Sequence, residues 1–123
     1  MAPGRHILLV DDDPIFLSAM ASALRSSGYR VTEAAHFTTA LDTLDDVDKK
    51  PDLVVTDIVM PSSINGIAIG RMARMRYHDI PVVYLTGYDL PVAERAASGP
   101  VLRKPIDADR LIEAIEAEFL KPA

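Results

Sequence analysis

The fold is decided by the stretch Ile7-Leu8-Leu9-Val10-Asp11-Asp12-Asp13, in which four apolar residues lead directly into three acids. A second stretch, Leu53-Val54-Val55-Thr56-Asp57, repeats the pattern with one acid at its end. Both apolar runs have the length and the Val, Ile and Leu content of strands covered on both faces of a parallel sheet. If the two strands are neighbours, their acids meet at the carboxyl edge of the sheet, where open α/β folds place their ligands.

Size and composition are those of one ordinary globular domain. The chain has 123 residues, of which 49% are hydrophobic and 25% are charged, and these values argue against disorder. We therefore expect a single domain over residues 1–123, without an effector domain. The sequence contains no Cys, which excludes disulfides, thiolate metal sites and a cysteine nucleophile.

The net charge of the chain limits the classes of partner that the protein can bind. A net charge of -5 argues against a nucleic-acid surface, because phosphate contacts need clustered Lys and Arg. The apolar run near the N-terminus is too short for a signal peptide or a membrane span. We expect a cytoplasmic protein that binds neither nucleic acid nor membrane. His6, His36 and His78 lack metal-ligand spacing, and we predict that all three are solvated surface residues.

Strand-length apolar runs alternate with stretches of helical period, a pattern typical of a parallel sheet with crossover helices. The predicted strands are residues 7–10, 29–33, 53–56, 81–85 and 101–102. Right-handed crossovers then give a three-layer α/β/α sandwich. The second strand is followed only by Ala34-Ala35, which offer no chemistry, so we expect it at an edge of the sheet.

The helical stretches carry recognisable start and stop signals. The first helix should begin at Pro14 with Asp13 as its N-cap and end at Gly28, which suits a left-handed C-terminal residue. We expect its apolar face to consist of Ile15, Phe16, Ala19, Met20, Ala23 and Leu24. The third helix follows Gly66, and we expect its Met72 and Met75 to pack in the core. The segment 89–98 contains Pro91, so its helix should be short.

Polar residues follow four of the five predicted strands. The first strand is followed by the three acids, the third by Asp57, the fourth by Thr86 and the fifth by Lys104. Clustered carboxylates are ligands for a hard divalent cation such as Mg²⁺. One further carboxylate, a hydroxyl donor and a cation are the parts that phosphoryl transfer needs, because its transition state is stabilised by positioning and charge neutralisation. These strand ends therefore predict a magnesium-dependent phosphate site.

In its motifs the chain resembles the receiver domains of two-component response regulators, of the stand-alone chemotaxis type. The matching elements span nearly the whole chain in the family's order, and the ordered set is far more specific than any single motif. They are Val10-Asp11-Asp12-Asp13-Pro14, Asp57-Ile58-Val59-Met60-Pro61, Asn65-Gly66, Leu85-Thr86-Gly87 and Lys104-Pro105. The resemblance implies an α/β fold with a five-stranded parallel sheet in the flavodoxin-like order 2-1-3-4-5.

The resemblance also implies a role for each site residue. Asp57 would be the phosphoacceptor, a nucleophile that forms an aspartyl phosphate. Mg²⁺ would be held by Asp12, by Asp57 and by the backbone carbonyl of Val59, with Asp11 acting through a bound water. Lys104 would pair with one phosphoryl oxygen, and Thr86 would donate its hydroxyl to another. The Lys104-Pro105 peptide bond is expected to be cis, an isomer that proline permits.

The resemblance implies a signalling protein rather than an enzyme that turns over a substrate. A histidine kinase or a histidine phosphotransfer protein would supply the phosphoryl group, and an unidentified protein would be the downstream target. The chain would be a monomer or a weak homodimer.

Two departures from the family's pattern affect how the domain would signal to its target. Val101 stands where receivers usually carry an aromatic residue, and the segment between Thr86 and Lys104 is short. Tyr84, which shares a strand face with Thr86, is predicted to fill the space beside Val101.

Two other functions compete with this one. A haloacid-dehalogenase-like phosphatase also uses Asp-x-Asp after its first strand, then a Thr and a Lys, and Asp11, Asp13, Thr86 and Lys104 imitate that order. Such an enzyme needs a longer chain and has no use for Asp57. The remaining alternative is a degenerate receiver that acts as a binding scaffold without phosphorylation. The complete set of acids, Thr86 and Lys104 argues against it.

Overall fold

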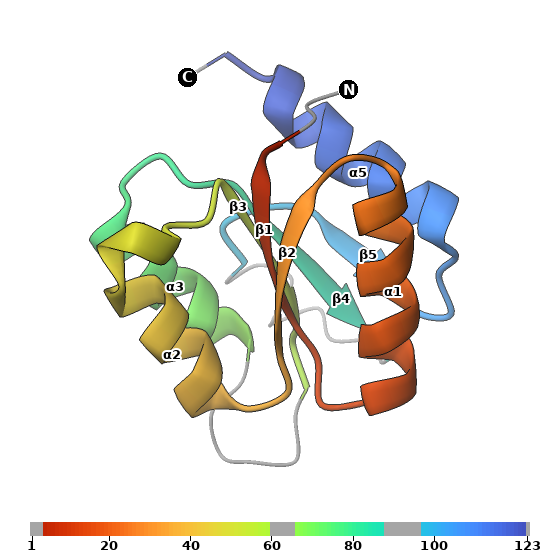
Figure 1. Cartoon of the computed structure of the whole chain (residues 1–123), viewed down its shortest axis with the longest axis horizontal. Helices are drawn as coiled ribbons and strands as arrows, with labels where there is room; N and C mark the ends of the chain where they lie inside the picture. The colour runs from red at the N-terminus through yellow and green to blue at the C-terminus, as the bar shows by residue number, and fades with distance from the viewer. Residues whose placement is uncertain (1–3, 60–65, 88–96, 123) are drawn as a thin grey trace.

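A computed structural model describes residues 4–59, 66–87 and 97–122 of the chain. Five parallel strands form one sheet in the order β2-β1-β3-β4-β5 (Figure 1). This order and the parallel arrangement confirm the expected flavodoxin-like fold. The strands are β1 (His6–Val10), β2 (Arg30–Ala34), β3 (Leu53–Asp57), β4 (Val82–Thr86) and β5 (Val101–Arg103).

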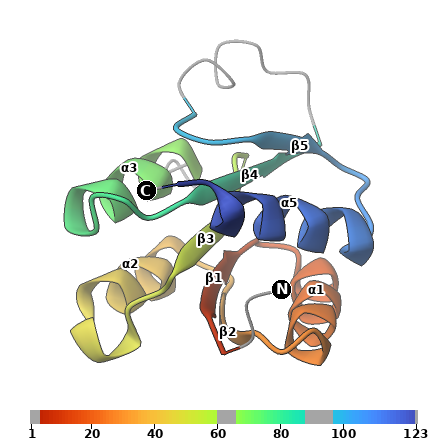
Figure 2. The ribbon, with the colours of Figure 1, turned by 90° about the horizontal axis from the view of Figure 1, so that it is seen from above.

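Helices cover both faces of the sheet and make a three-layer sandwich. α1 and α5 lie on one face, and α2 and α3 lie on the other (Figures 1 and 2). The helices are α1 (Pro14–Ser26), α2 (Phe37–Asp45), α3 (Gly66–Arg76) and α5 (Ala108–Leu120), and a short 3-10 turn η1 (Val47–Lys49) precedes β3. The predicted short helix in segment 89–98 falls mostly outside the described residues.

The predicted boundary signals of α1 are confirmed. Oδ1 of Asp13 accepts hydrogen bonds from the backbone N–H groups of Ile15 at 3.0 Å and Phe16 at 3.3 Å, which satisfies donors at the exposed start of the helix. Just beyond the other end, Gly28 has a φ of 97°, a conformation that an L-residue with a Cβ rarely adopts. The cap places the acids of the preceding loop at the sheet edge.

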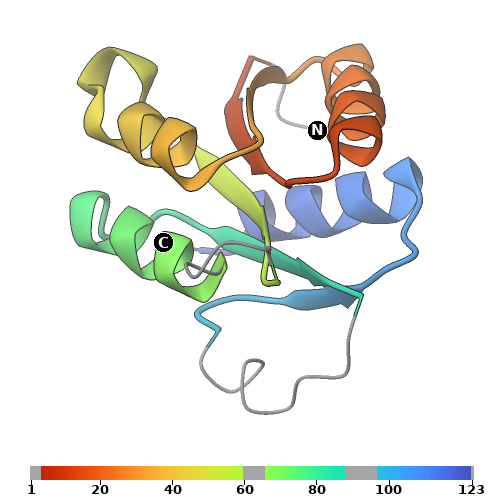
Figure 3. The ribbon, with the colours of Figure 1, turned by 90° about the horizontal axis from the view of Figure 1, so that it is seen from below.

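Central strands of the sheet are fully buried. Every residue of β1, β3 and β4 is buried, as the near-continuous apolar sequences predict. In the register of β1 and β3, Val10 lies beside Thr56. The next residue on each strand is therefore an acid, and the two acids emerge side by side at the carboxyl edge. Figure 3 looks onto this edge.

Some predictions about side-chain burial on the helices are wrong. Ile15 of α1 is 81% exposed, Met75 of α3 is 82% exposed, and Ala19 of α1 is exposed as well. On α1 the buried residues are Leu17 and Ala21, together with the predicted Leu24. On α3 they include Ile67, Ile69, Gly70 and Ala73.

The prediction for His6 is also wrong, because this residue is buried rather than solvated. Its Nε2 lies 2.7 Å from Oγ1 of Thr32, and its Nδ1 lies 3.2 Å from the carbonyl oxygen of Lys50. The two ring nitrogens are thus satisfied by neighbouring segments, as a buried polar group requires. His36 and His78 are exposed, as expected.

Across the described residues, α1, α2, α3 and α5 are each too short or too polar to serve as a membrane span.

Candidate functional site

Three acids converge at the carboxyl edge of the sheet. Asp11 follows β1 and is fully buried, Asp57 ends β3 and is 6% exposed, and Asp12 is partly open to solvent. One carboxylate oxygen from each residue lies within 4.8 Å of the other two. Three convergent carboxylate oxygens are a donor set that suits Mg²⁺. The structure therefore brings together the acids that the sequence analysis selected as metal ligands, and it separates them from Asp13, which caps α1.

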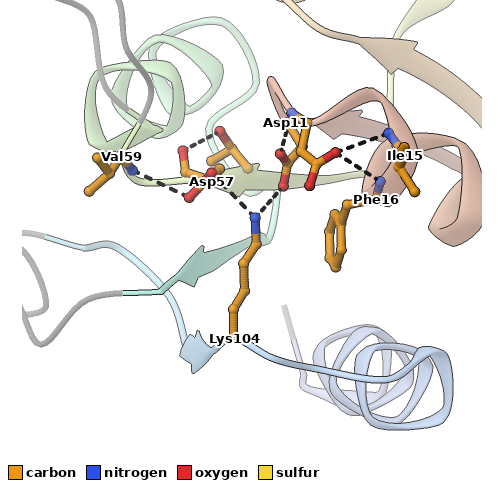
Figure 4. A network of polar contacts seen from close by, with 8 residues as sticks. Asp11, Ile15, Phe16, Asp57, Val59 and Lys104 are labelled. Atoms are coloured by element: carbon orange, nitrogen blue, oxygen red, sulfur yellow. Dashed lines mark hydrogen bonds and ion pairs between the residues drawn. The ribbon is translucent and has the colours of Figure 1, made fainter.

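Lys104 reaches into this cluster from the end of β5. Its Nζ donates to Oδ2 of Asp11 at 2.7 Å and to Oδ2 of Asp57 at 3.4 Å (Figure 4). The same Nζ lies 4.4 Å from the centre of the Phe16 ring, so the ammonium group has a cation–π contact from the start of α1. The Lys104-Pro105 peptide bond is cis, as expected. One cation thus bridges two buried acids.

Burial and neighbouring charges shift the pKa values of Asp57 and Lys104. Burial raises the pKa of Asp57 above its ordinary value; Lys104 opposes this effect, and the negative charge of Asp11 adds to it. Burial by itself would lower the pKa of Lys104, but the hydrogen bond to Asp11 and the charges of Asp57 and Asp11 outweigh it, so the pKa of Lys104 is raised. The ammonium group therefore stays charged beside the acids.

Backbone hydrogen bonds hold the ends of the strands that carry the other predicted site residues. Oδ1 of Asp57 accepts a hydrogen bond from the N–H of Val59 at 3.3 Å. The carbonyl oxygen of Thr86 accepts from the N–H of Lys104 at 2.7 Å, which holds the ends of β4 and β5 together. The Thr86 side chain is fully buried at the end of β4, the strand beside Asp57. All predicted site residues therefore lie at the same end of β1, β3, β4 and β5, which are neighbours in the sheet.

Gly66 is a site residue whose role the sequence analysis did not identify. Its N–H donates to the carbonyl oxygen of Ile58 at 3.0 Å, and a Cβ at this position would lie 2.0 Å from the backbone oxygen of Asp57. Only a residue without a side chain allows the start of α3 to approach β3 so closely. The signal in the sequence was the Gly itself, placed nine residues after the acid.

Tyr84 lies beside Val101 in the register of β4 and β5, in agreement with the prediction that it fills this space. It is fully buried, and its hydroxyl lies 2.9 Å from Oγ of Ser98. A Cβ at Gly70 of α3 would lie 2.0 Å from this hydroxyl oxygen. The aromatic ring that this chain places near Thr86 is therefore held in the core between β4, α3 and the segment before β5.

Comparison with known protein families assigns the chain to a family. The sequence model of the response regulator receiver domain matches residues 7–116. The chain belongs to the response regulator receiver domain family. This receiver domain is 34% identical to the C4-dicarboxylate transport transcriptional regulatory protein DctD of Pseudomonas aeruginosa, with 89% of the chain but only 24% of DctD covered. It is 31% identical to the response regulator receiver protein CpdR of Brucella abortus, with 91% of the chain and 94% of CpdR covered.

Solved structures lead to the same assignment. A response regulator receiver protein from Sinorhizobium medicae superimposes with a TM-score of 0.86 at 29% identity, covering 94% of each chain. The response regulator TrrA of Thermotoga maritima, solved with Mg²⁺ and BeF, gives 0.77 at 27% identity and covers 93% of this receiver domain and 98% of TrrA. The receiver domain of the hybrid histidine kinase CckA gives 0.74 at 30% identity, with 92% and 97% covered. The chain is thus a phosphoacceptor receiver domain in fold and family.

Proposed function

We propose that Asp57 is the residue that accepts the phosphoryl group in this receiver domain. The observation that supports this assignment is its position: Asp57 ends β3, the strand between β1 and β4, in the cluster with Asp11 and Asp12, and its Oδ2 lies 3.4 Å from Nζ of Lys104. A carboxylate oxygen of Asp57 attacks phosphorus, a new O–P bond forms, and the bond from phosphorus to the donor atom breaks. The product is an aspartyl phosphate.

Mg²⁺ is the proposed cofactor. Asp12 and Asp57 would hold it directly together with the backbone carbonyl of Val59, and Asp11 would support it through water. When bound, the ion neutralises negative charge on the phosphoryl oxygens and on the acids. The match between three convergent carboxylate oxygens and the ligand preference of Mg²⁺ supports this assignment, as does the Mg²⁺ in the related structure of TrrA.

Lys104 and Thr86 are proposed to stabilise the phosphoryl group through hydrogen bonds to its oxygens. The Lys104 ammonium group already lies between Asp11 and Asp57, so it needs only to transfer a hydrogen bond to an incoming oxygen. Phe16 keeps the lysine side chain in this position through its ring. Thr86 would donate its hydroxyl to a second phosphoryl oxygen, and its burial keeps water from that side.

The proposed donor is a phosphohistidine on a histidine kinase or a histidine phosphotransfer protein. The start of α1 offers it a surface next to the site, because Ile15 is 81% exposed while its backbone N–H is bound to the Asp13 cap. We place this exchange in the cytoplasm, where ATP charges the kinase. The single domain would then signal through a partner protein, as a monomer or a weak homodimer. Binding to nucleic acid or membrane is not part of the proposal.

One experiment separates this function from its alternatives. The protein is incubated with acetyl phosphate and Mg²⁺, and its intact mass is measured for wild type, Asp57→Asn and Asp11→Asn. A receiver gains one phosphoryl group, which Asp57→Asn abolishes and EDTA prevents. A haloacid-dehalogenase-like phosphatase would release phosphate with turnover that depends on Asp11 and survives Asp57→Asn. A degenerate receiver would show no mass change in any variant.

A further inference from the structure

A groove lies at the edge of the sheet opposite the acid site. This groove has a volume of about 580 Å³, within the range of roughly 300–1,000 Å³ that is usual for small-molecule sites. It lies where the strands begin, near the C-terminal ends of α3 and α5, at the edge that Figure 2 views from above. Its lining includes Arg5, Lys50, Arg74, Tyr77, His78 and Phe119. None of these residues takes part in the proposed phosphoacceptor chemistry.

Two cations of the groove are positioned by aromatic rings. The guanidinium carbon of Arg5 lies 4.4 Å from the centre of the Phe119 ring, and Nζ of Lys50 lies 5.1 Å from the centre of the Tyr77 ring. Such contacts fix the direction of a long side chain without neutralising its charge. Among the described residues, neither cation forms an ion pair with a carboxylate. Both remain available to an anionic ligand.

Arg74 adds a third cation with an unused donor. Its Nη2 donates to the carbonyl oxygen of Ser98 at 2.8 Å, but its Nε is buried and has no hydrogen-bond partner within the described part of the chain. A buried N–H of a charged group is destabilising when it stays unpaired. An anionic oxygen is the acceptor that a guanidinium group binds most strongly. Arg74 lines the groove and forms no ion pair with a described carboxylate, so its charge is available to an anionic ligand.

Carboxylates line the groove as well. Glu118 forms an ion pair with Lys121, Oδ2 of Asp52 accepts the backbone N–H of His6 at 2.8 Å, and the exposed Asp79 lies 4.0 Å from the ring nitrogen of His78. None of the described carboxylates forms an ion pair with Arg5, Lys50 or Arg74. Three cations without a carboxylate partner therefore line one groove in a chain whose net charge is -5, so their gathering does not follow from a generally basic surface.

We infer that this groove binds a small organic polyanion of nucleotide size through its phosphate groups, which Arg5, Lys50 and Arg74 would contact. The volume exceeds what an inorganic ion needs, and three separate cations favour several negative charges on the ligand. We expect the groove to recognise its ligand by charge rather than by stacking on an aromatic ring. The Phe119 ring already contacts the Arg5 guanidinium group and packs against Tyr29 with 6.2 Å between ring centres. The inference is independent of the role proposed for Asp57.

The test uses ATP as the probe, titrated into the full chain by calorimetry at low ionic strength in EDTA, so that no metal bridges the ligand to the acids. We expect saturable binding that weakens about tenfold in Arg5→Gln and, separately, in Lys50→Gln, since each removes one charge-assisted hydrogen bond. Arg110→Gln is the matched control, because Arg110 is exposed on α5 and does not line the groove. It should leave the affinity unchanged.

Two comparisons make the outcome decisive. Citrate should bind more weakly than ATP, and tighter citrate binding would overturn the assignment to phosphate groups. Lys104→Gln should leave ATP affinity unchanged, whereas loss of binding in that variant would place the ligand in the acid site and refute the inference. Absence of saturable binding, or an equal loss in Arg110→Gln, would refute it as well. Circular dichroism spectra in EDTA that match wild type show that Arg5→Gln, Lys50→Gln and Lys104→Gln are folded.

Discussion

Lys104 Nζ lies 2.7 Å from Oδ2 of Asp11, a carboxylate that has no exposure to solvent. Among the described residues, Lys104 supplies the positive charge that contacts both Asp11 and Asp57. Removing one partner of such a buried pair leaves a charge without compensation, which costs far more than an exposed pair contributes. The stability of the metal-free domain therefore depends on Lys104.

The first prediction concerns Lys104→Met. In EDTA it should lower the free energy of unfolding by about 2 kcal/mol, because two buried carboxylates lose their cation. Mg²⁺ should recover much of the loss, since it supplies positive charge to the same oxygens. Urea denaturation with and without Mg²⁺ measures both effects. Lys49→Met, at an exposed position in η1, is the control and should change little. Equal stability of the two variants would contradict the role given to Lys104.

The second prediction concerns pH. Because burial raises the pKa of Asp57 above its unfolded value, the folded state keeps the proton to higher pH, and stability falls as pH rises between the two values. Asp57→Asn removes this cost. In EDTA it should raise the melting temperature at pH 7, and the gain should vanish in acid, below the unfolded pKa of 3.8. Thermal melts over a pH series test this, and a constant gain at every pH would count against the explanation.

Gly66 provides a third prediction. A Cβ at Gly66 would lie 2.0 Å from the backbone oxygen of Asp57, so Gly66→Ala must displace either α3 or the strand end that carries the acid. We expect a loss of about 1–3 kcal/mol in stability and slower phosphorylation by acetyl phosphate. Gly87→Ala is the matched control near the same edge, because a Cβ there meets no described atom within 4 Å. Similar rates for the two variants would rule out the close approach as a constraint.

The fourth prediction couples Tyr84 to Gly70. Gly70→Ala should destabilise the fold, because its Cβ would lie 2.0 Å from the Tyr84 hydroxyl oxygen. Tyr84→Phe should cost about 1 kcal/mol through loss of the hydrogen bond to Ser98. The double variant should lose less than the sum of the two, since removing the hydroxyl relieves part of the clash. Strictly additive free energies from denaturant titration would disprove this contact.

The sheet and the acid site could be predicted from sequence because their signals are local. A buried strand reads as a continuous apolar run, and the residue that follows it reaches the carboxyl edge whatever the rest of the chain does. Asp11, Asp57 and Lys104 were found in this way. The cap of α1 was equally local, since Asp13 and its acceptor role lie within one turn.

What the sequence could not predict depends on contacts between distant segments. Ile15 and Met75 have apolar side chains at helical spacing, yet both are exposed, because the side of each helix that is buried depends on how it packs against the rest of the fold. His6 is buried because Thr32 and Lys50, far along the chain, accept or donate at its ring. The close approaches of Gly66 to Asp57 and of Gly70 to Tyr84 are likewise visible only in three dimensions.

The central claim is that Asp57 carries the phosphoryl group. The most direct measurement is to phosphorylate the protein with acetyl phosphate and Mg²⁺, reduce the acyl phosphate with borohydride and map the product by peptide mass spectrometry. We predict conversion of Asp57, and of no other acid, to homoserine, with none formed when Mg²⁺ is omitted. Homoserine at Asp11 or Asp12, or unmodified Asp57 in a protein that has taken up phosphate, would contradict it.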